Sequence, residues 1–262
     1  MKGTGREPCA IIMPTCARHA HFAELGARSL DALWPGHQPL WIISGGWTMS
    51  GSRVVCTERR DWVGAMDEGL GQLLARGAIA ASPWVLVVLE DHAPTRPVKA
   101  DVIAAAISIA EERGADYVKL DAFYGSVMRL DGAILGHRVA VMNPHWQWYH
   151  SLQPAAWRVG HLMTTLSRAA ARGALDPWSF EEVPWNGRRH LAVESVWPSA
   201  HGGFLARGRV NIRAVLDMRH PASRELRWAL IREWLPEMAR RRLGGMMKTL
   251  QMRVGADLRR GP

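Results

Sequence analysis

Three side chains able to bind a metal ion or a phosphate stand together at Glu90, Asp91 and His92. They follow an apolar run at 84–89 that is rich in branched residues and lacks a helical period, which predicts a strand buried on both faces. Ligands bind beyond the carboxyl ends of strands in open α/β sheets, and adjacent acids are costly there unless solvated, paired or metal-bound. The pattern favours a divalent-metal and phosphate site, and a helix cap or surface acid pair is the alternative.

A second group of acids and aromatic rings lies at 176–182, where the sequence reads Asp-Pro-Trp-Ser-Phe-Glu-Glu. Glu181 and Glu182 either belong to a functional cluster or simply flank or cap a helix. His201 and Arg207 lie in a later glycine-rich segment, where a histidine is more often a plain loop residue.

The elements that must position these residues alternate between strands and helices. Apolar runs predict strands, and apolar residues at helical spacing predict helices. The expected strands are 10–16, 39–44, 54–56, 84–89, 117–120, 138–142 and 191–197, and the expected helices are 20–33, 62–76 (capped by Asp61), 98–113, 154–172 and 223–241. We therefore expect an α/β fold with a mostly parallel, Rossmann-like sheet flanked by helices. Motifs of the GxGxxG, P-loop and GxSxG types are absent from the sequence.

Composition places the chain among ordinary globular proteins. Of its 262 residues, 48% are hydrophobic and 22% are charged, which is enough for one large domain. Its three cysteines form no CxxC pair, which argues against a disulfide scaffold or a structural zinc site and fits a reducing compartment. No stretch approaches the length of a membrane span, and the apolar run at 10–13 is too short for a signal peptide. We expect a cytoplasmic protein.

The positive charge is concentrated in the last 45 residues. Segment 218–262 contains eleven basic and four acidic residues, so it carries +7 of the net +9. A nucleic-acid-binding domain is expected to carry its charge on the body of the fold, so no nucleic acid is expected as a partner. A solvated helix is the simple interpretation of this basic extension. A second hypothesis is that 240–252, which combines arginines with Leu and Met, docks on an anionic membrane surface.

The order of several short motifs resembles that of bacterial glycosyltransferases with the GT-A fold, of the kind found in surface-polysaccharide clusters. The resemblance covers roughly residues 8 to 212. It is carried by Pro-Thr-Cys-Ala-Arg-His at 14–19, Trp62, Glu-Asp-His at 90–92, Tyr-Val-Lys-Leu at 117–120, Ser-Leu-Gln-Pro-Ala-Ala-Trp-Arg at 151–158, Asp-Pro-Trp-Ser-Phe-Glu at 176–181 and His-Gly-Gly with Arg-Gly at 201–208.

This resemblance implies a nucleotide-sugar donor held with the help of Mg²⁺ or Mn²⁺. Glu90, Asp91 and His92 stand in the place of the DxD-like acids of such enzymes. The metal would be bound by Asp91 and by His201 from the glycine-rich segment. The donor would be contacted by Thr15, Cys16, Arg18, Glu90, Asp91, His92, Gln153, Trp157, Arg158 and Arg207. Glu181 matches the position of the catalytic base in inverting enzymes, and Glu182 is the neighbouring candidate.

The sequence thus predicts a GT-A-like domain at 1–217 followed by a basic helical extension at 218–262. The expected activity is transfer of a sugar from a nucleotide donor to an acceptor hydroxyl on a glycan, a lipid-linked molecule or a small molecule, with inversion. A lipid-linked acceptor would suit an enzyme that is peripheral at the inner face of the membrane. Two alternatives remain: a non-catalytic protein that binds a nucleotide sugar or glycan, and a basic protein that contacts nucleic acid or a membrane surface through its extension.

Overall fold

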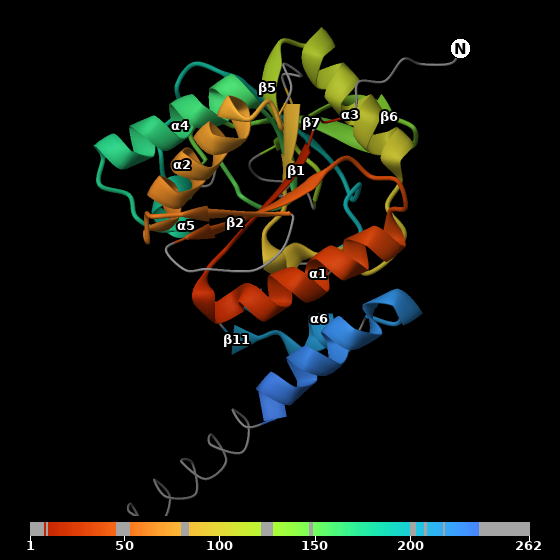
Figure 1. The fold of residues 1–262 in the computed structure, drawn as a ribbon. Coiled ribbons are helices and arrows are strands. Elements are labelled where there is room, and N and C mark those ends of the chain that lie inside the picture. The colour runs from red at the N-terminus through yellow and green to blue at the C-terminus, as the bar shows by residue number, and fades with distance from the viewer. Residues whose placement is uncertain are drawn as a thin grey trace, which may run out of the picture.

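A computed structural model describes residues 8, 10–45, 53–79, 84–121, 128–146, 149–199, 203–206, 209–216 and 218–235. In this part of the chain, a nine-stranded sheet has the order β3-β2-β1-β4-β8-β5-β9-β7-β6 and is flanked by helices (Figure 1). The strands are β1 Ala10–Thr15, β2 Leu40–Gly45, β3 Val54–Thr57, β4 Trp84–Val87, β5 Ala115–Lys119, β6 Met128–Ile134, β7 His137–Met142, β8 Ala155–Arg158 and β9 Arg189–Val193. A separate small hairpin pairs β10 Leu205–Ala206 with β11 Arg209–Val210.

The sheet is mixed rather than mostly parallel. Strands β3, β2, β1 and β4 run parallel, as the sequence predicted for the first half of the chain. Strand β8 is antiparallel to both of its neighbours, β4 and β5. Beyond it, β5 and β9 are parallel, while β7 and β6 add an antiparallel edge. Because β4 and β5 both oppose β8, they point the same way and their carboxyl ends lie at the same edge of the sheet.

Alternating side chains of the strands build a core on each face of the sheet. On β1, Ile11 and Met13 pack with α1 (Ala20–Leu33) and α3 (Ala100–Glu112), whereas Ala10 and Ile12 pack on the opposite face with α2 (Trp62–Ala75), α4 (Val159–Ala171) and α5 (Pro177–Glu181). A strand with both faces covered consists almost entirely of apolar residues, as β4 does, and its four residues are fully buried.

Two helices begin and end close to the predicted positions. Helix α1 spans Ala20–Leu33, and Phe22, Leu30 and Leu33 on its apolar face are buried. Helix α2 begins after Asp61, whose carboxylate accepts a 2.6 Å hydrogen bond from the Gly64 backbone N–H. This bond satisfies one of the free N–H groups of the first turn and confirms the predicted cap.

The prediction of a helix beginning at Pro154 is wrong. Residues 155–158 form strand β8, and helix α4 begins only at Val159. Strand β8 lies between β4 and β5 and pairs with both, and Ala155, Ala156 and Trp157 are buried among apolar residues. These tertiary contacts override the helical tendency of an Ala-rich segment after proline.

The end of the described chain packs beside α1 (Figure 1). After α6 (Ile212–Leu216) and the 3-10 turn η3 (Pro221–Ser223), residues 224–235 are helical. Leu226 and Leu230 are buried in a third core cluster with Phe22 of α1, whereas Leu235 is 54% exposed. The most basic part of the extension, 236–262, lies outside the described residues. Among the helices described, none has both the length and the apolar character that crossing a membrane requires.

Candidate functional site

The predicted Glu-Asp-His cluster lies at the carboxyl edge of the sheet. Beyond β4 the chain turns into a short 3-10 helix, η2 (Glu90–His92), which places Glu90 and His92 in buried positions. At the same edge, Thr15 ends β1 and is buried, and Asp121 follows β5. The structure therefore gathers polar residues from three strand ends, as expected for the ligand-binding edge of an α/β sheet.

A cationic histidine lies at the end of β1, in the 3-10 helix η1 (Ala17–His19). Nδ1 of His19 is 2.8 Å from Oε1 of Glu90. Hydrogen bonds with Cys16 and Glu90 raise the pKa of His19 to about 10, although partial burial opposes this shift. The same contact with His19 lowers the pKa of the exposed Cys16 thiol. An imidazolium ion thus faces this edge of the sheet at neutral pH, where it can attract an anion.

Asp91 is a largely buried carboxyl group with an unsatisfied oxygen. Burial, followed by the negative charges of Glu90 and Glu181, raises its pKa well above the usual range, while the charge of His19 acts in the opposite direction. Within the described residues, its Oδ1 atom has no hydrogen-bond partner. Because a carboxylate without a partner is costly to bury, the site fits either a bound proton or a cation at this atom.

The glycine-rich segment packs directly on Asp91. The Phe204 N–H donates a 2.7 Å hydrogen bond to the Asp91 carbonyl oxygen. Gly203 has a φ of +74°, and a Cβ atom there would lie 2.8 Å from Oδ2 of Asp91 and 3.1 Å from Nε2 of His92. Glycine is needed here because it tolerates the positive φ and because it has no Cβ atom to meet these side chains. His201 lies two residues before this contact but, like Arg207, outside the described residues, so its role as a metal ligand stays a prediction.

Lys119 and Asp121, at the end of β5, are site residues that the sequence reasoning missed. Lys119 is 0% exposed, and burial lowers its pKa to about 8 while the carboxyl groups of Asp121 and Glu181 oppose the shift. Its ammonium nitrogen lies 5.7 Å from the centre of the Trp146 ring. Asp121 Oδ2 is buried without a hydrogen-bond partner among the described groups. The sequence does contain a signal for these two residues, because each is a polar residue at the end of an apolar strand. The same signal identified Glu90.

Glu181 projects into this cluster from the end of α5. A capping box between Asp176 and Ser179 fixes the start of that helix, with the Ser179 N–H 2.8 Å from Oδ1 of Asp176. Oε1 of Glu181 accepts a 2.6 Å hydrogen bond from the Leu152 backbone N–H, and burial raises the pKa of the carboxyl group. Glu182, by contrast, is exposed. Of the two candidates for the catalytic base, Glu181 is therefore the one in a buried setting with a raised pKa.

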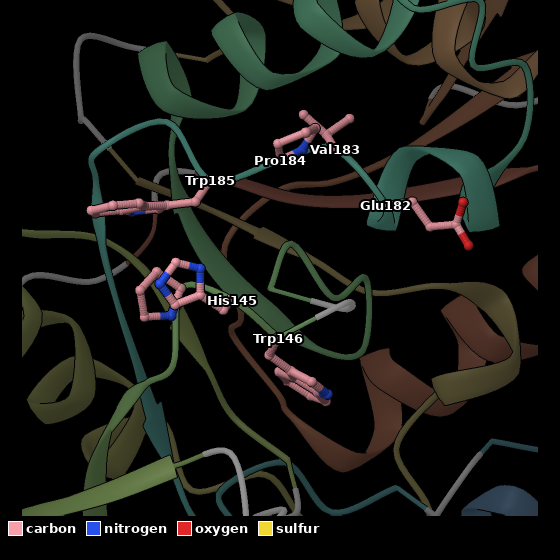
Figure 2. Close-up of a pocket in the computed structure, with 7 residues that line it drawn as sticks. His145, Trp146, Glu182, Val183, Pro184 and Trp185 are labelled. Atoms are coloured by element: carbon pink, nitrogen blue, oxygen red, sulfur yellow. The ribbon is translucent and has the colours of Figure 1, made fainter.

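An open pocket of about 600 Å³ is lined by Glu182, one residue after Glu181. Its walls are Pro144, His145, Trp146, Glu182, Val183, Pro184 and Trp185 (Figure 2). Figure 2 shows Trp185 and His145 at one end of the pocket and Glu182 at the other. The Trp185 indole N–H donates to the Arg188 carbonyl oxygen at 2.8 Å, which helps to hold the ring in place although it is exposed. Exposed indole rings of this kind offer flat apolar surfaces with a polar edge.

The structure contradicts two of the predicted donor contacts. Trp157 is 0% exposed and packs edge-on against Tyr117, with ring centres 4.5 Å apart, so it has no surface for a ligand. Arg158 pairs in the sheet with Trp84, at the opposite edge from Glu90, and forms a 3.1 Å ion pair with Asp116. Both corrections follow from the antiparallel direction of β8, which carries Arg158 away from the site.

Two further predicted donor contacts, Gln153 and Arg18, lie at the expected edge. Gln153 lies just before β8, and its backbone N–H donates to the Ser151 hydroxyl at 3.3 Å. Arg18 is exposed on η1, next to His19. Their contacts with a donor remain predictions.

No protein-family model matches the sequence, and no curated protein matches it. Among solved structures, similar chains include a CMP:2-keto-3-deoxy-manno-octonic acid synthetase complexed with CTP (12% identity, 71% of this chain and 89% of that chain, TM-score 0.41). A 4-diphosphocytidyl-2C-methyl-D-erythritol synthase has 14% identity, with 70% of this chain and 91% of that chain covered and a TM-score of 0.42. A UDP-glucose pyrophosphorylase complexed with UDP-glucose has 10% identity, with 71% of this chain and 90% of that chain covered and a TM-score of 0.42. Likeness at this level assigns no activity to the chain, so its function must be inferred from its own residues.

Proposed function

We propose that the chain is a nucleotide-sugar-dependent glycosyltransferase in which Glu181 removes the proton from the acceptor hydroxyl. The supporting observation is that two buried carboxyl groups, Asp91 and Glu181, lie 90 residues apart in sequence yet interact electrostatically at one edge of the sheet. Both have raised pKa values. A base is most effective when its pKa approaches the working pH, so burial makes Glu181 a better proton acceptor than an exposed carboxylate such as Glu182.

The charges of the site suit the donor's diphosphate. His19 supplies an imidazolium ion near the end of β1, and Lys119 is protonated below a pH of about 8. Asp91, whose Oδ1 atom accepts no hydrogen bond from the described residues, fits the oxygen ligand that Mg²⁺ or Mn²⁺ requires, and His201 is the second ligand proposed. A divalent ion held there would neutralise charge on the leaving diphosphate.

The aromatic pocket would hold the acceptor. Trp146 lies between Lys119 and the pocket, and Glu182 lines the pocket one residue after Glu181. A hydroxyl group held there would lose its proton to Glu181 as its oxygen bonds to the anomeric carbon. The bond from that carbon to the diphosphate oxygen breaks, and its electron pair leaves with the nucleoside diphosphate. One displacement with a single base inverts the anomeric centre.

The first test is binding of a panel of nucleoside diphosphates to the full chain, measured by thermal shift with and without Mn²⁺. We expect one nucleotide to raise Tm in the presence of the metal, because a ligand that binds only the folded state stabilises it. The shift should disappear in Asp91→Asn, which keeps the shape of the side chain. A well-folded sample whose Tm responds to no nucleotide would contradict the proposal and favour an interaction protein.

The second test separates the two acidic candidates by kinetics. With the nucleotide sugar identified by the first test, Glu181→Gln should lower kcat by about 10²–10⁴-fold while donor binding is retained. Glu182→Gln, a matched change one residue away, should act on the KM of the acceptor and lower kcat by less than roughly tenfold. If the wild type binds the nucleotide sugar without turnover, the chain is a binding protein. Release of pyrophosphate from a nucleoside triphosphate would instead indicate nucleotidyl transfer.

We also propose that the basic extension brings the enzyme to an anionic membrane surface, where a lipid-linked acceptor would lie. The support is the concentration of +7 in 218–262. Binding to liposomes containing anionic lipid should be lost on deletion of 240–262 and weakened by salt. Binding that survives the deletion would contradict this role.

A further inference from the structure

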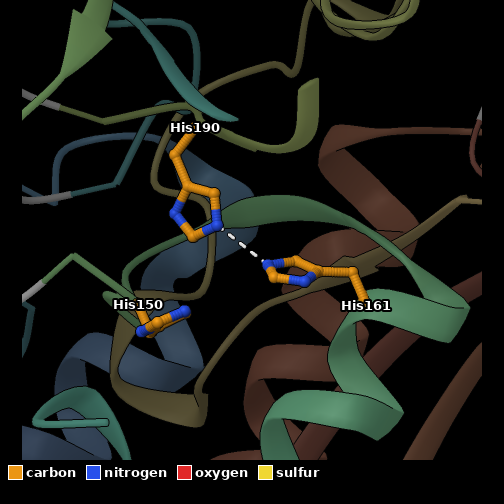
Figure 3. A group of neighbouring side chains, drawn as sticks. All are labelled: His150, His161 and His190. Carbon is orange, nitrogen blue, oxygen red and sulfur yellow. Dashed lines mark hydrogen bonds between the residues drawn. The ribbon is translucent and has the colours of Figure 1, made fainter. Parts of the chain in front are cut away.

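Three buried histidines converge inside the core, away from the strand ends that form the candidate site. His150 precedes β8, His161 lies on α4 and His190 lies on β9, and each is at most 6% exposed. One ring nitrogen from each lies within 4.8 Å of the other two. Figure 3 shows the rings of His161 and His190 facing each other, with His150 beside them. Imidazole groups are rarely buried together without a ligand or a complete set of hydrogen bonds.

Backbone carbonyl groups fix the orientation of two of these rings. Nδ1 of His150 is 2.9 Å from the Val183 carbonyl oxygen, and Nδ1 of His190 is 2.9 Å from the Tyr149 carbonyl oxygen. A carbonyl oxygen only accepts hydrogen bonds, so both Nδ1 atoms must carry the proton, and each Nε2 atom keeps its lone pair. In metal sites, the second ring nitrogen of a ligating histidine makes this kind of contact.

One of these lone pairs has no partner. Nε2 of His150 is buried and, among the described residues, accepts no hydrogen bond. Nε2 of His190 accepts a hydrogen bond from Nε2 of His161 at 2.8 Å. Nε2 of His161 therefore carries the one proton that lies between the three rings.

A metal ion can replace that proton if the three rings shift. Zinc binds imidazole nitrogens at about 2.0–2.1 Å, so two such ligands of a tetrahedron lie about 3.3 Å apart. The 2.8 Å separation of His161 and His190 would then widen by about half an ångström, and the nitrogen of His150, within 4.8 Å of the other two, would move closer to them. The proton of His161 would move to Nδ1, which lies 3.5 Å from the Asn186 side-chain amide, and the amide oxygen can accept it after the group turns over.

We propose that His150, His161 and His190 form a binding site for one Zn²⁺ ion that is separate from the nucleotide-sugar site. Three neutral imidazoles suit zinc and similar transition metals and are a poor donor set for Mg²⁺ or Ca²⁺. Burial lowers the pKa of all three rings, which keeps them in the neutral form that binds metal. A solvent molecule would complete the tetrahedron.

The ion would connect three parts of the chain that lie far apart in sequence. The segment at 149–153 carries His150 and also the Leu152 N–H that binds Glu181. His161 belongs to the first turn of α4, and His190 belongs to a central strand. A metal held by all three would fix this segment against the sheet.

The test uses the full chain and requires no knowledge of the substrate. Protein purified without metal-affinity tags should contain about one zinc per chain by mass spectrometry of the elements. After treatment with a chelator, added Zn²⁺ should raise Tm by roughly 5–10 °C at a free concentration about a hundred times Kd. Co²⁺ should produce the visible absorption of a tetrahedral site, and Mg²⁺ should leave Tm unchanged. A chelated wild type whose Tm and spectrum respond to neither Zn²⁺ nor Co²⁺ would overturn the proposal.

Substitutions locate the site. His150→Gln and His190→Gln should lose the bound zinc, while His137→Gln on β7, whose ring contacts the Glu194 carbonyl oxygen, should retain it. Zinc retained at full stoichiometry in a folded His190→Gln protein would place the ion elsewhere and refute the assignment. If the core variants fail to fold, the metal titration and the cobalt spectrum of the wild type still decide the question.

Discussion

The buried ammonium group of Lys119 should make the stability of the protein depend on alkaline pH. Its pKa is about 8 in the folded chain, against an ordinary value of 10.5. Between these pH values, the unfolded chain binds more protons than the folded chain, so the free energy of unfolding rises with pH. At about 1.4 kcal/mol per pKa unit, the whole effect is about 3 kcal/mol. The destabilisation is complete below about pH 8 and disappears above about pH 10.5.

Replacing the charge isolates this contribution. Lys119→Met keeps the length of the side chain but removes the ionisable group. Most other residues titrate alike in both proteins, so their effect drops out of the difference between the two unfolding free energies. Urea denaturation at several pH values from about 7 to about 10.5 would measure that difference. We expect the wild type to gain about 3 kcal/mol relative to the variant across this range.

A constant difference between the two proteins would refute the reasoning. It would mean that Lys119 titrates at its ordinary pKa and is therefore solvated or more strongly paired than its burial indicates. The same titration bears on activity, because loss of the ammonium group removes a positive charge beside Glu181. The rate of the proposed sugar transfer by the wild type should fall above about pH 8, and the variant should lack this fall.

Two further predictions concern neighbouring parts of the site. Iodoacetamide should modify Cys16 faster than Cys56 near neutral pH, because His19 lowers the pKa of the Cys16 thiol although both cysteines are exposed; equal rates by peptide mass spectrometry would contradict this. Gly203→Ala should lower Tm and weaken nucleotide binding, because the added methyl group meets Asp91. Gly71→Ala, in open space on α2, should instead stabilise the fold by up to about 1 kcal/mol, so a loss of Tm in both variants would show that the Asp91 contact is not the cause.

Local sequence patterns were sufficient to predict strand β4 and helices α1 and α2. The apolar run before Glu90 indicated a strand buried on both faces, and β4 is fully buried. Helices α1 and α2 were predictable from apolar spacing, and Asp61 caps α2 as expected. In each case, the residues that define the element also make its stabilising contacts, so periodicity and capping chemistry are sufficient.

The direction of β8 could not be predicted in the same way. Pro154 followed by two alanines is a good helix start, and only the free edges of β4 and β5 make a strand there more favourable. That error placed Trp157 and Arg158 at the wrong edge of the sheet. The histidine cluster could not be predicted for a related reason: His150, His161 and His190 come from three separate segments, with no spacing that resembles a metal-binding motif.

The central position of β8 has a consequence for how the chain assembles during synthesis. Within the described residues, the group β3-β2-β1-β4 and the group β5-β9-β7-β6 share no hydrogen-bonded strand pair, and β8 alone joins them. Until residues 155–158 have left the ribosome, both β4 and β5 present open edges of apolar strands. Such edges recruit other strands, so chains that end before 155 should aggregate. Strand β9, which leaves the ribosome later, then joins β5 to β7 and completes the sheet.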